Sequence, residues 1–275
     1  MIHPTAVIYP GAVLGSNVAI GPYSIIGDKV VLGDDCQIGP HVTIEGNTNI
    51  GSGAKIYQFA SIGAPPQDLS YKGEETKVEI GAGVIIREYV TIHRGTVRGR
   101  GATIIGPHSY LMAYCHVAHD CILGPGVIMA NSAHLGGHID IGERAILGGV
   151  VAVHQFVRIG DFALVGGVSG VAKDVPPYTL ASGSRIHVYG LNDLGLRRNG
   201  FSTETILQLK RAFKIAFRSS LRIEEAAEKI RTEMAGTPEA VKFADFLVTS
   251  KRGMARVSLS RHSFRTNSAW KRLES

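Results

Sequence analysis

The sequence is poor in cysteine. Only three of its 275 residues are cysteines, Cys36, Cys115 and Cys121, and their spacing matches no zinc or redox motif. An odd number of scattered cysteines is typical of proteins whose thiols stay reduced, so we expect no disulfide. Each of the three occupies a position that the repeat described below reserves for small inward-facing residues. We therefore interpret them as core residues and not as nucleophiles.

The sequence also lacks long apolar runs. No stretch approaches the roughly 20 apolar residues that are needed to span a bilayer. The first residues lack the charged segment followed by an apolar run that marks a secretory signal. We therefore expect a cytoplasmic protein without an integral membrane segment. Aromatic residues make up only 7% of the chain and charged residues 19%, whereas 44% is hydrophobic, which is enough for one large core and a small appendage.

What the sequence does contain is glycine, at 34 positions, and a period of six residues. Every sixth residue from Ile2 to Ile62 is aliphatic, and Ile80, Ile86 and Ile92 lie in the same phase. After a slip of one residue the period resumes at Ile105 and runs to Val171. An α-helix has 3.6 residues per turn and would spread such a repeat over all its faces. The pattern instead predicts a β-solenoid of short strands, with one aliphatic side chain stacked inside each side and tight corners between sides.

This repeat resembles that of the hexapeptide-repeat transferases over about residues 1–178. The resemblance implies a left-handed parallel β-helix with three hexapeptides in each coil. Handedness comes from the family alone, because general chirality rules favour right-handed parallel crossovers. Three hexapeptides per coil place residues that are 18 apart directly above one another.

The interruptions of the repeat predict the domain organisation. Two breaks are expected to form projecting loops, where function concentrates in solenoids: residues 64–79 and 97–104. The pattern ends near residue 178, and residues 179–201 are interpreted as a connecting segment. Residues 202–256 are predicted to form a small helical domain, with Ser202 as the N-cap of a helix over 204–219, a second helix over 223–234 and a third opened by Pro238. Residues 257–275 are predicted to be a basic, mobile tail.

The 18-residue spacing brings polar residues into columns on the surface of the second block. His119, Gly137 and Gln155 share one column, and His116 and His134 share another. For one surface histidine, plain solvation is the simpler interpretation, and it stays preferred for His134. A column that unites a histidine, a glycine and a glutamine points instead to a groove that binds substrate.

The residue types in this column suit acyl transfer. Neutral imidazole has a pKa suited to accepting a proton from a sugar hydroxyl, and His119 is the candidate general base. Asp120 follows it at a corner and could hold the imidazole in the required tautomer. Gly137 leaves its backbone N–H uncovered, as an oxyanion donor requires.

Several motifs resemble the UDP-N-acetylglucosamine 3-O-acyltransferase family, which begins the synthesis of the lipid A of lipopolysaccharide. The matching segments extend from the solenoid into the helical region as far as about Arg256: 56–63 (IYQFASIG), 67–69 (QDL), 91–96 (TIHRGT), 116–121 (HVAHDC), 152–156 (AVHQF), 174–178 (DVPPY) and 197–201 (RRNGF). The resemblance implies transfer of a 3-hydroxyacyl chain from acyl carrier protein to the sugar 3-hydroxyl, by general-base catalysis without an acyl-enzyme. It also implies a homotrimer with sites between subunits, and it argues against a cofactor or a metal. We expect no nucleic-acid partner, because the chain is basic but carries no nucleic-acid-binding motif.

The resemblance assigns roles to individual residues. His119 matches the base, Asp120 its partner and Gly137 the oxyanion donor, and Gly167 falls where the family sets acyl length. The positions that match substrate contacts are Asp68, His93, His116, His138 and His154 around the glucosamine and the acyl-carrier arm, Gln155 at the diphosphate, and Asn192 and Arg198 at the nucleotide. Three positions depart from the family pattern and should alter local contacts: Ser70, Leu194 and Asn199.

Other functions remain open at this point. The histidine cluster also fits a zinc-dependent carbonic anhydrase of solenoid fold. A purely structural solenoid without an active site is another alternative. The later N-acyltransferase of the same pathway is a third, but it carries an additional N-terminal domain, and a repeat that begins at Ile2 leaves no room for that domain. The basic positions of the first long helix fit either a solvated face or a surface for an acidic carrier protein. The sequence leaves open the acyl length and whether the acceptor is a hydroxyl or an amine.

Overall fold

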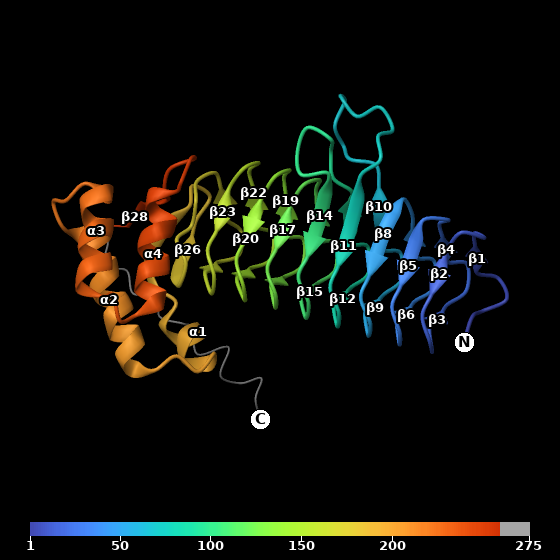
Figure 1. Ribbon diagram of the computed structural model, residues 1–275, viewed down its shortest axis with the longest axis horizontal. Helices are drawn as coiled ribbons and strands as arrows, with labels where there is room; N and C mark the ends of the chain where they lie inside the picture. Colours follow the sequence, from blue (N-terminus) through green and yellow to red (C-terminus); the bar gives the residue numbers. More distant parts are fainter. Residues whose placement is uncertain (259–275) are drawn as a thin grey trace.

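The computed structural model describes residues 1–258 and consists of a long β-helix with a cluster of helices at its C-terminal end (Figure 1). The solenoid is a left-handed parallel β-helix, as the resemblance implied. Three sheets form its sides, and their strands pair in parallel except for β26 (Thr179–Ser182) with β27 (His187–Leu191). The first sheet contains β1 (Val7–Ile8), β4 (Ile25–Ile26), β7 (Thr43–Ile44), β10 (Ser61–Ala64), β13 (Thr91–His93), β16 (His116–Val117), β19 (His134–Leu135), β22 (Ala152–Val153) and β25 (Gly170–Val171).

From β1 to β24 (Leu164–Val165), each strand of the first sheet is followed along the chain by one strand of the second sheet and then one of the third. The second sheet contains β2 (Val13–Leu14), β5 (Val30–Leu32), β8 (Asn47–Ile50), β11 (Lys77–Ile80), β14 (Ala102–Ile105), β17 (Ile122–Leu123), β20 (Asp140–Ile141) and β23 (Arg158–Ile159). The third sheet contains β3 (Ala19–Ile20), β6 (Gln37–Ile38), β9 (Lys55–Ile56), β12 (Ile85–Ile86), β15 (Tyr110–Leu111), β18 (Ile128–Met129), β21 (Ile146–Leu147), β24 (Leu164–Val165), β26 (Thr179–Ser182), β27 (His187–Leu191) and β28 (Arg256–Val257).

The aliphatic residue of each hexapeptide is what holds the coils together. Val117 pairs with Leu135 and Leu135 with Val153, each 18 residues further along the chain, and all three side chains are buried. Burial of such side chains contributes about 1.5–3 kcal/mol each. The predicted 18-residue stacking is therefore confirmed for this unbroken stretch.

Corners are made by residues in the left-handed backbone region. At the corner between the first and second sheets, Asp120, His138 and Phe156 have φ of 61°, 61° and 65°. The N–H of His138 donates to the carbonyl of His119, and that of Phe156 to the carbonyl of Gly137, so successive corners are locked in register. We call residues 119–120, 137–138 and 155–156 the histidine corner.

Two loops leave the solenoid at the predicted breaks and project from the same side of it (Figure 1). The first joins β10 to β11 over residues 65–76, and the second joins β13 to β14 over residues 94–101. Both loops end three residues earlier than the expected 64–79 and 97–104, and the second also begins three residues earlier than expected. The reason is pairing between neighbouring coils, since Lys77 already pairs with Ala102 as the two strands begin.

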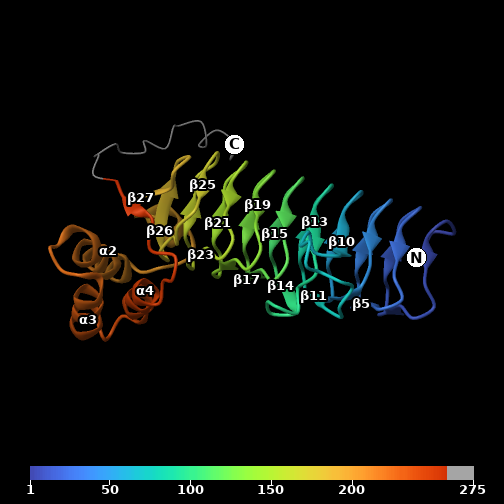
Figure 2. The ribbon, with the colours of Figure 1, turned by 90° about the horizontal axis from the view of Figure 1, so that it is seen from above.

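The C-terminal region contains four helices within the described residues: α1 (Asp193–Arg198), α2 (Thr203–Arg218), α3 (Ile223–Glu233) and α4 (Pro238–Val248). Of these, α2, α3 and α4 lie together beyond the last coils (Figure 2). Ser202 caps α2 as expected, since its side chain accepts from the Thr205 N–H. None of the helices within residues 1–258 is long and apolar enough to cross a membrane.

The segment between solenoid and helices is more regular than expected. Residues 179–201 contain β26, β27 and α1, and β26 continues the third sheet by pairing with β24. The chain returns at β28, where Val257 pairs with Val188. Of the predicted tail 257–275, residues 257 and 258 therefore lie against β27, and residues 259–275 lie outside the described part of the chain.

Candidate active site

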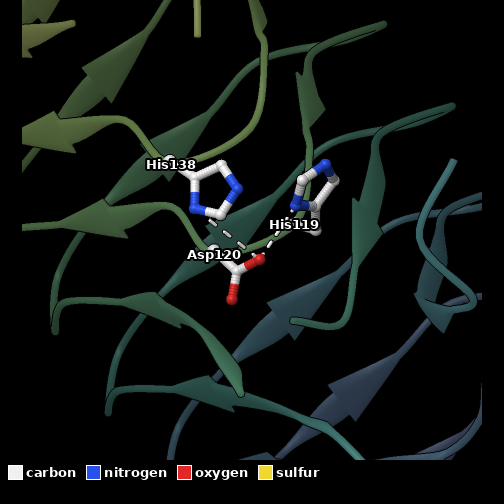
Figure 3. Close-up of side chains that lie close together, drawn as sticks. All are labelled: His119, Asp120 and His138. Atoms are coloured by element: carbon white, nitrogen blue, oxygen red, sulfur yellow. Dashed lines mark hydrogen bonds and ion pairs between the residues drawn. The ribbon is translucent and has the colours of Figure 1, made fainter. Parts of the chain in front are cut away.

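His119 lies at the histidine corner with only 7% of its surface exposed (Figure 3). Its Nδ1 is 2.9 Å from Oδ2 of Asp120. An ionised carboxylate only accepts hydrogen bonds, so Nδ1 carries the hydrogen and Nε2 keeps a free lone pair. A Cβ placed on Gly137 would lie 2.7 Å from Nε2, so that edge of the ring lies directly against the glycine. The carboxylate neighbour thus fixes the tautomer of this imidazole, as in other histidine–carboxylate pairs.

Asp120 is fully buried and is surrounded by donors. Its carboxylate accepts from the N–H and hydroxyl of Thr96 and from the N–H of Arg100, in addition to His119. Burial raises the pKa of this carboxyl, but the hydrogen bonds from His119, Thr96 and Arg100 outweigh it and lower the pKa to about 2. Asp120 is therefore a carboxylate at neutral pH.

His138 completes the group that Figure 3 shows. Its ring stacks on Phe156 at 4.5 Å between centroids and meets the ring of His119 edge-on at 5.0 Å. Its Nδ1 is 3.9 Å from Oδ2 of Asp120. Burial lowers the pKa of His138, although the charge of Asp120 opposes this. The site thus presents two imidazoles next to one carboxylate.

Two further histidines line the first sheet beside this corner. The His116 Nδ1 lies 2.7 Å from the Thr91 hydroxyl, and the rings of His93 and His116 meet edge-on at 4.9 Å. Burial lowers the pKa of His116 to about 4 and also lowers that of His93. His93 is buried with an unpartnered Nδ1. Both rings are therefore neutral at pH 7 and can donate or accept a hydrogen bond.

Asp68 reaches the site from the loop 65–76. Its Oδ1 accepts from the Ser70 N–H at 2.8 Å, which lowers the pKa of Asp68, with smaller contributions from the charges of His119 and Arg98. The backbone of Ser70, one of the three departures from the family pattern, thus holds the turn that carries Asp68 through an N–H that any residue could supply.

The remaining sequence-predicted residues divide between this corner and others. His154 and Gln155 are exposed at the histidine corner, where the backbone carbonyl of Gln155 lies 3.2 Å from the His154 Nδ1. Gly167 lies at the corner between the third and first sheets, where an added Cβ would come within 3.1 Å of the Gly149 carbonyl. That close approach is a packing reason for glycine, independent of any role in acyl length.

Asn192 and Arg198 are not brought to the histidine corner within one chain. Asn192 caps α1, since its side chain accepts from the Gly195 N–H, and its amide donates to the Phe162 carbonyl at the corner between the second and third sheets. Arg198 is exposed in α1. The pair Asn192-Asp193 is a capping signal that could have predicted α1 from the sequence.

The same group of residues could be considered for a metal ion. The candidate ligand atoms of His119, Asp120 and His138 all lie within 4.8 Å of one another. The two Asp120 oxygens, however, already accept hydrogen bonds from Thr96, Arg100 and His119, whereas a zinc ligand directs a lone pair at the metal. The donor set therefore fits a histidine–carboxylate pair better than a metal centre.

The fold and this corner define a hexapeptide-repeat transferase. The model of the bacterial transferase hexapeptide family matches residues 29–64 and 102–137, and that of UDP-N-acetylglucosamine O-acyltransferase domain 2 matches residues 174–255. More specifically, the chain belongs to the acyl-[acyl-carrier-protein]–UDP-N-acetylglucosamine O-acyltransferase family and is an O-acyltransferase. The family resemblance drawn from the sequence is thereby confirmed.

The relatives match almost from end to end. The protein of that name from Thermodesulfovibrio yellowstonii is 52% identical over 255 residues, which are 93% of this chain and 99% of the relative, and that from Syntrophobacter fumaroxidans is 50% identical over 256 residues with the same coverage. The solved structure of LpxA from Acinetobacter baumannii is 46% identical with a TM-score of 0.90, and covers 93% of this chain and 99% of its own.

Proposed function

We propose that this protein transfers a 3-hydroxyacyl chain from an acyl carrier protein thioester to the 3-hydroxyl of UDP-N-acetylglucosamine, in the cytoplasm, as the first step of lipid A biosynthesis. The observation that carries the proposal is the buried His119–Asp120 pair with Gly137 directly against the imidazole. The names of relatives at 48–52% identity support the substrates.

In the proposed mechanism, Nε2 of His119 takes the proton of the sugar 3-hydroxyl, and the oxygen attacks the thioester carbonyl. The tetrahedral oxyanion accepts a hydrogen bond from the Gly137 N–H, which has no partner among the described residues. When the intermediate collapses, the carbon–sulfur bond breaks and the imidazolium returns its proton to the leaving thiolate. Asp120 stays ionised throughout and stabilises the imidazolium.

Direct transfer without an acyl-enzyme is supported by the state of the cysteines. Cys115 and Cys121 are completely buried, and burial raises the pKa of their thiols to about 11 and about 12. A nucleophilic cysteine needs the thiolate and access to substrate, and neither residue has them. We propose that no cofactor and no metal take part.

A homotrimer with sites between subunits is part of the proposal. Asn192 and Arg198 match nucleotide positions of the family but lie away from the histidine corner of their own chain. A neighbouring copy could supply them.

For the carrier protein we propose the basic face of α2, where Lys210, Arg211, Lys214 and Arg218 line a groove of about 550 Å³, because acyl carrier proteins are acidic.

The test is to incubate the purified protein with UDP-N-acetylglucosamine and a series of 3-hydroxyacyl carrier proteins, and to measure products by mass spectrometry. We expect a product heavier by one hydroxyacyl group, and the preferred donor reports the acyl length. Rapid quenching with labelled donor should leave no label on the protein. No product with any donor, together with stoichiometric zinc, would instead favour the metal-dependent function.

A further inference from the structure

The loop 94–101 is an insertion in the repeat, and it closes over the carboxylate of Asp120. We propose that Thr96 and Arg100, neither of which we expect to touch substrate, are positioning residues that fix Asp120 so that it can orient His119. This inference rests on the proposed function, and it adds a role for the inserted loop.

The contacts of Thr96 are specific for the carboxylate. The Thr96 N–H lies 3.1 Å from both Asp120 oxygens, and its hydroxyl donates to Oδ2 at 2.7 Å. Thr96 is itself buried, so these donors have little competition from water. Hydrogen bonds to an ionised acceptor are among the stronger ones in proteins.

Arg100 secures the other end of the same loop. Its N–H donates to Oδ1 of Asp120 at 2.7 Å, and its guanidinium donates to the Asp120 carbonyl at 3.0 Å. The guanidinium also pairs in two-pronged fashion with Asp140 on β20, one coil further along, at 2.5 and 2.9 Å. The loop is thus tied to the solenoid wall beside Asp120.

Steric fit also indicates that the loop is built around this carboxylate. A Cβ on Gly99 would lie 2.3 Å from Cγ of Asp120 and 2.4 Å from Oδ2, so only glycine allows the loop to pass so close. On the other side, the Asp120 N–H donates to the Thr103 hydroxyl at 2.9 Å, which holds the corner backbone. The side chain is therefore enclosed by the loop on one side and by His119 on the other.

These contacts fix the orientation of the Asp120 carboxylate. Since the loop donors occupy both oxygens, the carboxylate cannot rotate without breaking several hydrogen bonds. Oδ2 is thereby held in the place where it accepts from Nδ1 of His119, and Nε2 is directed to the substrate side. The same donors satisfy a buried charge that would otherwise be costly.

The first test is Thr96→Val, which keeps the shape and the backbone donor but removes the hydroxyl. We expect kcat to fall about 10- to 100-fold, with KM for UDP-N-acetylglucosamine within about twofold of the unchanged protein, since binding groups are untouched. Thr96→Ser keeps the hydroxyl and should restore most of kcat. The matched control is Thr43→Val on β7 of the first sheet, which should have wild-type kinetics.

A double-mutant cycle separates positioning from a general loss of structure. In an Asp120→Asn background, Thr96→Val should lower kcat by less than about twofold, because residues that act as one unit are not additive. Equal losses in both backgrounds, or a wild-type kcat for Thr96→Val, would overturn the inference. If Thr96→Val fails to fold, Arg100→Gln replaces it with the same expected pattern, and Arg231→Gln, which loses ion pairs with Glu228 and Asp245 in the helical region, is its control. Absence of product from the unchanged protein would instead refute the proposed function.

Discussion

The chemistry of the candidate site depends on the contact between one imidazole and one glycine. A Cβ on Gly137 would lie 2.5 Å from Cε1 of His119, closer than non-bonded atoms come. Gly137 therefore has a steric role toward the base in addition to its proposed role as oxyanion donor.

This contact gives a prediction for Gly137→Ala. The methyl group should displace the His119 ring and cover the N–H, so we expect kcat to fall by about 100-fold or more, as when an oxyanion donor is removed. The affinity for the UDP-sugar, measured by calorimetry, should change little. The control is Gly236→Ala in the helical region, where an added Cβ meets no atom within 4 Å. Full activity of Gly137→Ala would show that the imidazole does not act where it lies here.

Residue-scale features were predictable where the repeat determines them. The column of His119, Gly137 and Gln155 follows from an 18-residue spacing that backbone pairing enforces. Thr96 and Arg100 were missed because loops have no period, and because two of the donors to Asp120 are backbone N–H groups, which any residue type could supply. Asn192 was assigned to nucleotide binding alone, and its capping role was overlooked although the following aspartate signals a helix start.

At the scale of elements, the corners carry part of the stability of the solenoid. One corner presents the aromatic ladder, a column of five stacked rings with centroids 4.9–5.2 Å apart: Tyr23, His41, Phe59, Tyr89 and Tyr114. The four tyrosine and phenylalanine side chains are each more than 40% exposed. The three inner rings stack on both faces, and Tyr23 and Tyr114 are the ends of the column. Stacking between coils offsets the cost of the left-handed backbone at this corner.

Phe59 allows these two opposing effects to be separated. It stacks on both His41 and Tyr89, and its φ is 63°. Phe59→Ala should lower the free energy of unfolding by about 1–3 kcal/mol, because two ring contacts are lost. Phe59→Gly loses the same contacts but relieves about 1 kcal/mol of backbone strain, so it should be the more stable of the two variants. Chemical denaturation measures both, and the opposite order would contradict the account of the corner.

The loop 65–76 depends on one arginine for its position. Nε and Nη2 of Arg94 donate to the Tyr71 hydroxyl at 3.0 and 2.9 Å, and Nη1 donates to the Gly63 carbonyl at 2.8 Å. The loop carries Asp68, which we propose contacts the sugar.

Arg94→Met should therefore loosen the loop and raise KM for UDP-N-acetylglucosamine by about 10-fold, with kcat reduced much less, since the base is untouched. Tyr71→Phe removes the acceptor and should act in the same direction. Steady-state kinetics with saturating acyl donor measure both variants. An unchanged KM in both would separate Asp68 from substrate binding.

At the scale of the whole molecule, histidines that are buried or half-buried make stability depend on pH. Burial lowers the pKa of His93, His116 and His138 below 6.5, to about 4 for His116. Between about pH 6.5 and 4 the unfolded chain therefore binds more protons than the folded one, and the free energy of unfolding must fall as the pH falls. Asp120 acts in the same direction but mainly below about pH 5, because its folded pKa of about 2 lies below its ordinary value of 3.8 and the unfolded chain takes up this proton first.

Thermal denaturation at pH 7 and pH 5 tests this dependence. We expect a lower midpoint at pH 5, and a smaller difference between the two pH values in His116→Gln, which cannot be protonated. Because the quantity compared is the change in midpoint between pH 7 and pH 5 within each protein, a general destabilisation by the substitution cancels. An equal difference in both proteins would mean that His116 is protonated as easily when folded as when unfolded.

The architecture as a whole was the most predictable part, because each of its coils repeats the same residue types at the same positions. Aliphatic residues from Ile20 to Val171 fill one continuous interior. Regular structure beyond residue 178 was less predictable, since β26 and β27 carry no hexapeptide period and are defined by pairing with residues far along the chain. The six-residue period does not predict the number of subunits either. Analytical ultracentrifugation of the purified protein measures it, and the proposal expects a trimer.

The most direct test of the account is His119→Ala, measured both for turnover with a 3-hydroxyacyl carrier protein and for UDP-N-acetylglucosamine affinity by calorimetry. Loss of a general base should lower kcat by about 10²- to 10⁴-fold, while the dissociation constant of the UDP-sugar stays within a few-fold. Turnover near that of the unchanged protein would contradict catalysis by the His119–Asp120 pair.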